Sequence, residues 1–235
     1  MFHEWGLSVK WKHSILILAF QKQIDLKQMT CLLNTQETLM KIERNSEYPI
    51  DTIFLDRWSP RAFDASSMPA SDLFTILEAA RWAPSAFNLQ PWRFLYSYRD
   101  DVYWQDYLSL LDSFNASWAQ HASALLFVLS DTLIPGENNQ PDKRSNYHSF
   151  DTGAAWAQLA LQATLLGYHS HAMAGINFDA SRRNLFVPER YQVEIAIAIG
   201  KRTDQSILSE TLQAREQPSP RFPISEIAFA GVFPQ

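Results

Sequence analysis

The chain has 235 residues, of which 46% are hydrophobic and 19% are charged, and its formal net charge at pH 7 is −5. This length and composition suit one large globular domain, with or without extensions. An acidic chain lacks the basic surface on which general nucleic-acid binders and binders of anionic membranes depend, so we expect neither partner. The single cysteine, Cys31, excludes an intrachain disulfide and a metal cluster built on cysteines.

The N-terminal part differs in character from the rest of the chain. Residues 1–46 carry scattered Lys and Gln with little periodicity, and we interpret them as an extension to a main domain over residues 47–235. The extension is either an arm that packs on a partner subunit or an overlong start, because Met29 and Met40 offer later starts. No segment of the sequence reaches the roughly 20 apolar residues that cross a bilayer, and the apolar run 14–20 is followed by polar residues rather than a cleavage site. The sequence therefore predicts a cytoplasmic protein that is not exported.

Helix and strand signals are firmer from Tyr48 onward. Apolar residues at helical spacing predict a helix that is capped by Ser71 and stops at Pro84. A strand over 93–98 and a short helix over 103–111 follow.

Helix and strand signals also alternate along the second half of the chain. The continuous apolar run 124–129 predicts a buried strand, and the polar segment 133–149, rich in Pro, Gly and Asn, predicts a long loop of the kind that often serves as a lid. Asp151 is the expected cap of a helix that runs to Leu166 and is apolar on nearly every face, so we expect it to be buried all round. A further strand is predicted over 194–199.

The segment Arg57-Trp58-Ser59-Pro60-Arg61 places two guanidinium groups four residues apart around a serine hydroxyl. Arginine presents a rigid fork of donors and serine adds a small donor and acceptor, so such a segment can hold a phosphate and a polyol. Standing alone, it would equally suit a helix-capping turn with surface arginines.

A second segment, Pro84-Ser85-Ala86-Phe87-Asn88-Leu89-Gln90-Pro91-Trp92, is a turn bounded by prolines, entered from a helix and left by a strand. Its backbone N–H groups and small side chains are available to a planar ligand. Together with the arginine segment it resembles the nitroreductase-like family of FMN-dependent oxidoreductases. Three further pieces stand in that family's order: the surroundings of Asn115, the segment Met173-Ala174-Gly175 and the tail around Arg221. The resemblance covers roughly residues 48–231.

The resemblance implies which residues hold FMN. Arg57, Ser59 and Arg61 would contact the phosphate, the ribityl chain and the pyrimidine end, and Ala174 and Gly175 would offer backbone N–H groups to the redox-active ring nitrogen. The full set of implied cofactor-binding residues is Arg57, Trp58, Ser59, Arg61, Pro84, Ser85, Asn88, Asn115, Met173, Ala174, Gly175, Ser219 and Arg221.

The chain departs from the family pattern at three positions, two of them in this set. Trp58 stands where other members often carry a polar or basic residue, so we expect only its backbone to contribute. Trp118 replaces a lysine found in some members, and Ala174 replaces a glutamate found in many. Contacts to the pyridine nucleotide and polar contacts near the flavin should therefore differ from those of relatives.

The resemblance also implies a fold, an assembly and a reaction. It implies an α+β fold, with a central, mostly antiparallel sheet wrapped by helices, in an intertwined homodimer that holds FMN at its interface. The implied reaction is ping-pong: NADH or NADPH reduces FMN and leaves, and a nitroaromatic, a quinone or a similar conjugated acceptor then takes its place. No catalytic side chain is expected, because the flavin carries the chemistry.

Other functions remain open on the sequence alone. One alternative is a specialised flavin relative, such as a dehalogenase, a dehydrogenase or an oxygenase that consumes its flavin. Glu137, Lys143 and Tyr147 in the predicted loop would suit a dehalogenase's zwitterionic substrate. Another is a protein that binds FMN without turnover.

The sequence indicates no metal site. His169 and His171 alternate on a predicted strand and share a face, but no third ligand follows at a recognisable spacing, so we interpret them as packed or surface histidines. Lys201 and Arg202 after the last strand are alternative phosphate anchors, although a solvated pair is the simpler interpretation.

Overall fold

The computed structural model describes residues 44–234. Cys31, the apolar run 14–20 and most of the N-terminal extension lie outside the described residues, so what the sequence predicts for them stays a prediction. No helix within residues 44–234 is both long enough and apolar enough to cross a membrane.

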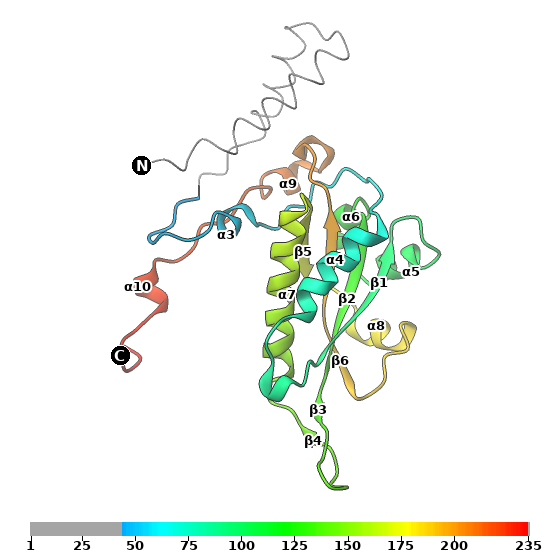
Figure 1. The fold of residues 1–235 in the computed structure, drawn as a ribbon. Helices are drawn as coiled ribbons and strands as arrows, with labels where there is room; N and C mark the ends of the chain where they lie inside the picture. Colours follow the sequence, from blue (N-terminus) through cyan, green and yellow to red (C-terminus); the bar gives the residue numbers. More distant parts are fainter. Residues whose placement is uncertain (1–43, 235) are drawn as a thin grey trace, which may run out of the picture. The chain divides into compact units, whose positions relative to one another are not determined.

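The centre of the fold is a four-stranded antiparallel sheet in the order β1-β2-β6-β5 (Figure 1). Its strands are β1 (Trp92–Tyr98), β2 (Ala124–Asp131), β5 (His169–Met173) and β6 (Tyr191–Gly200). The two inner strands read as nearly continuous apolar runs, because both faces of the sheet are covered. The predicted α+β fold with a mostly antiparallel sheet is confirmed.

Successive side chains along β2 point to opposite faces of the sheet and pack into two separate hydrophobic cores. Leu125, Phe127 and Leu129 point to a core shared with α5 (Trp104–Ser109), α6 (Ser113–Ala119) and α8 (Phe178–Asn184). Leu126 and Val128 point to the opposite core, which is closed by α4 (Ala70–Arg81) and the long helix α7 (His148–Leu165). Figure 1 shows α4 and α7 lying together across one face of the sheet.

Short elements complete the described chain. The helix α3 (Ile53–Asp56) precedes the arginine segment, and a two-stranded ribbon joins β3 (Leu133–Ile134) to β4 (Lys143–Arg144). The remaining short helices are η1 (Ala86–Asn88), η2 (Gln205–Ile207), α9 (Glu210–Gln213) and α10 (Ile224–Ile227).

Two predicted helix starts were wrong. Helix α4 begins after its N-cap Pro69 rather than after Ser71; at this position the missing N–H of proline removes no hydrogen bond of the helix. Helix α7 begins at His148, so Asp151 lies inside its first turn. The carboxylate of Asp151 instead accepts a hydrogen bond from the backbone N–H of Ala86, 3.0 Å away. Its role is tertiary rather than local.

Two other predictions need correction. Residues 133–149 are not a loop throughout, because they form the β3–β4 ribbon and the first residues of α7. Helix α7 is not buried all round: its sheet-facing side is buried, whereas Gly153 and Leu165 are exposed. The uniform apolar character of α7 therefore exceeds what the packing within one chain requires.

Candidate functional site

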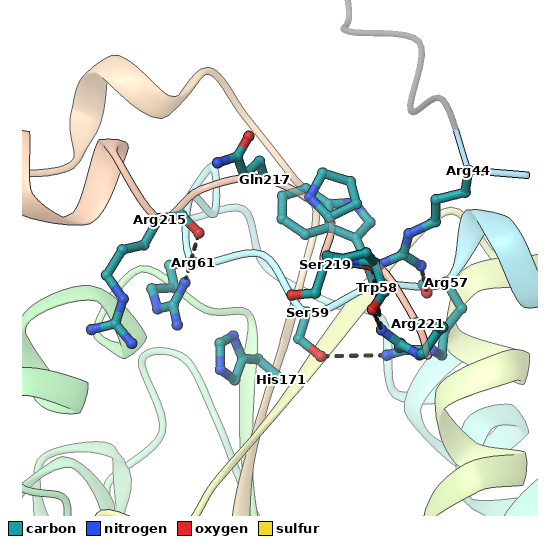
Figure 2. Close-up of a pocket in the computed structure, with 12 residues that line it drawn as sticks. Arg44, Arg57, Trp58, Ser59, Arg61, His171, Arg215, Gln217, Ser219 and Arg221 are labelled. Atoms are coloured by element: carbon teal, nitrogen blue, oxygen red, sulfur yellow. Dashed lines mark hydrogen bonds between the residues drawn. The ribbon is translucent and has the colours of Figure 1, made fainter. Parts of the chain in front are cut away.

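A pocket of about 630 Å³ forms where the segment after α3 meets the C-terminal tail. We call it the arginine pocket, because five of its lining residues are Arg44, Arg57, Arg61, Arg215 and Arg221 (Figure 2). The other lining residues are Trp58, Ser59, His171, Gln217, Pro218, Ser219 and Pro220.

The backbone that presents Arg57 is braced by Arg44. Helix α3 ends at Asp56, and Arg57 then adopts an extended conformation. The Arg44 Nη1 atom donates to the carbonyl oxygens of Leu55 and Arg57, at 3.2 and 2.9 Å. The Arg57 guanidinium in turn donates to Ser59 Oγ over 3.3 Å. Two guanidinium groups and a hydroxyl therefore converge on one wall of the pocket.

No carboxylate of the described residues compensates the charges of Arg44, Arg57 and Arg221. Burial lowers the pKa of Arg57, and the charge of Arg221 lowers it further. Burial likewise lowers the pKa of Arg44, followed by the charges of Arg221 and Arg57. None of the three lies within salt-bridge distance of a carboxylate in residues 44–234. Guanidinium groups held together in this way suit a multiply charged anion such as a phosphate.

Arg61 differs, because Glu216 compensates part of its charge. Glu216 Oε1 accepts hydrogen bonds from the backbone N–H groups of Arg61 and Ala62, at 2.7 and 2.9 Å, and Oε2 lies 3.7 Å from Arg61 Nη1. Burial lowers the pKa of Arg61 most, while Glu216 acts in the opposite direction. The buried Glu216 thus ties the C-terminal tail to the arginine segment.

His171 forms part of the pocket lining and is held by two contacts. Its ring packs against Trp118 with the ring centroids 4.6 Å apart, and its Nδ1 lies 3.0 Å from the carbonyl oxygen of Pro60. A carbonyl only accepts, so Nδ1 carries the proton. Burial lowers the pKa of His171 to about 4, and likewise that of His169. Both rings are therefore neutral near pH 7, and both side chains are half-buried.

Asn115 and Gly175 meet near the pocket, on α6 and after β5. The Asn115 side-chain amide donates to the Gly175 carbonyl oxygen over 3.2 Å, and the Asp112 backbone N–H donates to the same oxygen over 2.9 Å. A Cβ atom at Gly175 would collide with the side chains of Asp112 and Asn115, so this approach requires glycine. Met173 is buried at the end of β5, and Ala174 is exposed.

The turn that contains Pro84, Ser85 and Asn88 does not line the arginine pocket. It is attached to the first turn of α7 through Asp151, and Ser85 Oγ accepts a hydrogen bond from the Gln90 backbone N–H over 3.0 Å. Phe87 and Asn88 both have positive φ, and the Phe87 side chain is 87% exposed. Within one chain, this turn is therefore a separate group of predicted residues.

The structure thus divides the predicted residues into three groups. The arginine pocket collects Arg57, Trp58, Ser59, Arg61, Ser219 and Arg221. Asn115, Met173, Ala174 and Gly175 lie around the end of β5, and the turn carries Pro84, Ser85 and Asn88. Lys201 and Arg202 stack on the rings of Tyr168 and Trp58 and line no part of the pocket.

Sequence reasoning missed Arg44, His171, Arg215, Gln217 and Glu216. Arg215, Glu216 and Gln217 stand directly before the predicted Ser219 and Arg221, so the tail motif contained a signal for them. Arg44 belongs to no motif, because its contacts with the carbonyl oxygens after α3 depend on the fold.

Comparison with known proteins agrees with this architecture. The model of the Nitroreductase family matches residues 55–201 of the chain. The chain belongs to the nitroreductase family. Its fold neighbours include a crystal structure of an oxidoreductase containing FMN, with a TM-score of 0.81 and 50% identity, over 84% of this chain and 99% of that one.

More distant members of the nitroreductase family match over similar lengths. A structure of a protein assigned as a nitroreductase in complex with FMN, from Exiguobacterium sibiricum, has a TM-score of 0.62 and 26% identity, over 79% of this chain and 99% of that one. The CLA biosynthesis enone reductase of Lactiplantibacillus plantarum is 26% identical over 198 residues, which are 70% of this chain and 91% of the relative.

Proposed function

We propose that this nitroreductase-family protein is an FMN-dependent oxidoreductase that takes electrons from NADH or NADPH and passes them to nitroaromatics, quinones or similar conjugated acceptors. The observation that carries the proposal is the convergence of Arg44, Arg57 and Arg221, none of which is paired with a carboxylate among the described residues. That donor set fits a phosphate monoester, which carries up to two negative charges at pH 7. The FMN in the two related structures supports the same choice.

Each group of residues has a distinct task in the proposal. Arg57, Ser59 and Arg221 hold the phosphate end, and Arg61, fixed by Glu216, faces the pyrimidine end. Asn115 holds the Gly175 carbonyl oxygen and so orients the backbone N–H groups that follow β5. When bound, FMN supplies the hydride chemistry. No side chain is assigned as a proton donor, since His171 is neutral near pH 7 and protons are available from solvent.

We further propose that the working unit is a homodimer, as the resemblance implied. A second hollow of about 390 Å³ lies between Phe54 of α3 and the outer face of α7, where Trp156 and Leu161 line it, and it shares Arg57 and Ser59 with the arginine pocket. This apolar face has no cover within residues 44–234. A second copy packed on it would bury the face and would bring its own 84–88 turn to the site. NADH or NADPH as donor and a cytoplasmic location belong to the same proposal.

The first experiment is a visible absorbance spectrum of the purified protein, recorded before and after anaerobic addition of NADH and then NADPH. We expect flavin bands that bleach with at least one donor and return when a quinone is added. Bands that never bleach would support a flavin-binding protein without this turnover. A colourless protein that takes up neither FMN nor riboflavin would overturn the proposal.

A mixing experiment tests the shared site. Chains carrying Arg57→Ala and chains carrying Asn88→Ala are each expected to bind FMN weakly. When the two are co-expressed, a mixed dimer contains one site with both native residues, so FMN binding should partly return. No recovery, with a dimer demonstrated by light scattering, would contradict a site built from both copies.

A further inference from the structure

The arginine pocket carries more positive charge than one phosphate neutralises. Among residues 44–234, Glu216 is the one carboxylate within salt-bridge distance of its five guanidinium groups, which leaves four positive charges. A phosphate monoester brings about −1.5 to −2 at pH 7. With FMN bound as proposed above, about two positive charges therefore remain for a second ligand.

These charges form two sets, one on each side of Ser59 and His171 (Figure 2). Arg44, Arg57 and Arg221 lie on one side, close enough for their charges to interact. Arg61 and Arg215 lie on the other side, and Arg61 Nη1 is 3.4 Å from the Arg215 carbonyl oxygen. The first set suits the phosphate and keeps about one positive charge beyond it, and the second set, with Glu216 counted, holds the other.

Arg215 is the accessible member of the second set. Its side chain is exposed and has no carboxylate within salt-bridge distance in residues 44–234, whereas Arg61 is held by Glu216. The Arg215 guanidinium lies over the Phe114 ring, 5.4 Å from its centroid. Phe114 is 41% exposed and directly precedes Asn115 on α6. The chain therefore places a flat, partly exposed apolar ring beside the donor fork of a pocket-lining arginine.

We propose that Arg215, oriented by Phe114, selects electron acceptors that carry a carboxylate next to their conjugated system. This inference rests on the proposed function and deepens it by naming the acceptor class. A guanidinium binds a carboxylate through two parallel hydrogen bonds, and the aromatic ring favours a flat partner. For a nitro acceptor, NAD(P)H and one proton supply two electrons and two hydrogens, the nitro group becomes a nitroso group, and one water leaves.

The test compares matched anionic and neutral ligands on the FMN-loaded protein. Steady-state kcat/KM is measured for 4-nitrobenzoate and for 4-nitrobenzyl alcohol, and calorimetry measures the binding of benzoate and benzyl alcohol without turnover. The variants are Arg215→Gln, Arg215→Lys and, as a control that removes one exposed charge outside the pocket, Arg183→Gln. Each variant's flavin spectrum reports whether FMN is still bound.

In Arg215→Gln we expect the ratio of kcat/KM for the anionic over the neutral acceptor to fall by a factor of up to about five, the upper range of an exposed charge pair. Benzoate binding should weaken by a similar factor, and benzyl alcohol binding should not change. Arg215→Lys should keep part of the preference, because it keeps the charge but loses the planar fork. Arg183→Gln should behave like the wild type. Higher salt should reduce the wild-type preference.

Three other results would overturn the inference or the proposed function. An unchanged ratio and unchanged benzoate affinity in Arg215→Gln would overturn the inference while leaving the proposed function intact. A slower reduction by NADPH in stopped flow, with an unchanged acceptor ratio, would show that Arg215 serves a donor phosphate and would also overturn it. A protein that holds FMN but turns over neither acceptor would overturn the proposed function itself, and an unchanged benzoate affinity would then reject the role of Arg215 separately.

Discussion

The arginines of this molecule lie in two contrasting electrostatic environments. At Arg190, before β6, Nε donates to both carboxylate oxygens of Asp131, at 2.7 and 2.8 Å, and Nη1 lies 3.2 Å from Asp142. The hydrogen bond to Asp131 raises the pKa of Arg190. In the arginine pocket, burial and like charges lower the pKa of Arg57 and of Arg44. Carboxylates pair with the Arg190 guanidinium, whereas no carboxylate within residues 44–234 pairs with Arg57 or Arg44.

The difference separates a structural charge from a binding charge. Arg190 joins the end of β2 to the approach to the β3–β4 ribbon, and its charge has no need of a ligand. Arg57 and Arg221 raise the free energy of the ligand-free protein by repelling one another, and an anion removes that cost. Residue type alone does not reveal this distinction; the position of the carboxylates does.

The largest expected effect comes from removing a binding charge. Arg57→Met should weaken FMN binding by about 10- to 100-fold, since hydrogen bonds to charged groups contribute about 1.5–3 kcal/mol. The free energy of unfolding of the FMN-free protein should not fall, because a repulsive charge has been removed. Fluorescence titration with FMN and urea denaturation measure the two quantities.

Arg190→Met is the matched control for that variant. It should lower the free energy of unfolding and leave FMN affinity at the wild-type value, the reverse of Arg57→Met. If both variants lost FMN affinity equally, the distinction between the two arginine environments would fail.

The second prediction concerns the one compensated arginine of the pocket. Glu216→Ala would leave the backbone N–H groups of Arg61 and Ala62 without the acceptor they now share. A buried donor left unpaired costs about 1–3 kcal/mol, so we expect the free energy of unfolding to fall by about 2–4 kcal/mol. FMN affinity should fall as well, because the tail that carries Arg221 loses its attachment. Glu216→Gln, which keeps an acceptor oxygen, should restore most of the stability; equal losses in both variants would contradict this account.

How much of this was predictable from sequence depends on the range of the interactions. Strands over 93–98, 124–129 and 194–199 were predicted because their apolar patterns are local, and the motif around Arg57 and Ser59 was found in the same way. The hydrogen bond from the Ala86 backbone N–H to the Asp151 carboxylate joins residues 65 positions apart, so no local sequence pattern predicts it. The contacts of Arg44 with Leu55 and Arg57 escaped notice for the same reason.

The family resemblance supplied what local patterns did not, but only for positions that carry a motif. It pointed to Arg221 and Ser219, and the structure places both in the arginine pocket with Arg57. It also pointed to the tail segment that contains Arg215, but it gave no indication that the Arg215 guanidinium lies over the Phe114 ring, 5.4 Å from its centroid. Individual adaptations of a shared fold therefore have to be found in the geometry.

The third prediction uses the two histidines beside the arginines. Burial, with smaller effects of neighbouring arginine charges, lowers the pKa of His169 and of His171 from 6.5 to about 4. Between these values the unfolded chain binds more protons than the folded one, so stability is complete above about pH 6.5 and decreases as the pH falls toward 4. We expect a loss of about 1–3 kcal/mol per histidine over this range. Urea denaturation at several pH values should show a flatter profile for His169→Asn, and an unchanged profile would contradict the assigned pKa.

The smallest effect is expected where charges are already paired near solvent. Asp131→Asn removes one charge from the Arg190 pair but keeps an acceptor oxygen, and Arg190 is 37% exposed. Surface pairs of this kind contribute about 0.2–1 kcal/mol, so the free energy of unfolding should fall by no more than that, and less in high salt. FMN affinity should not change. A large loss of stability would mean that the pair is desolvated more than its exposure indicates, and a loss of FMN affinity would mean that charge at this end of the sheet reaches the binding pocket. Either result would contradict the distinction between Arg190, which stabilises the fold through ion pairs, and the arginines of the pocket, which bind an anion.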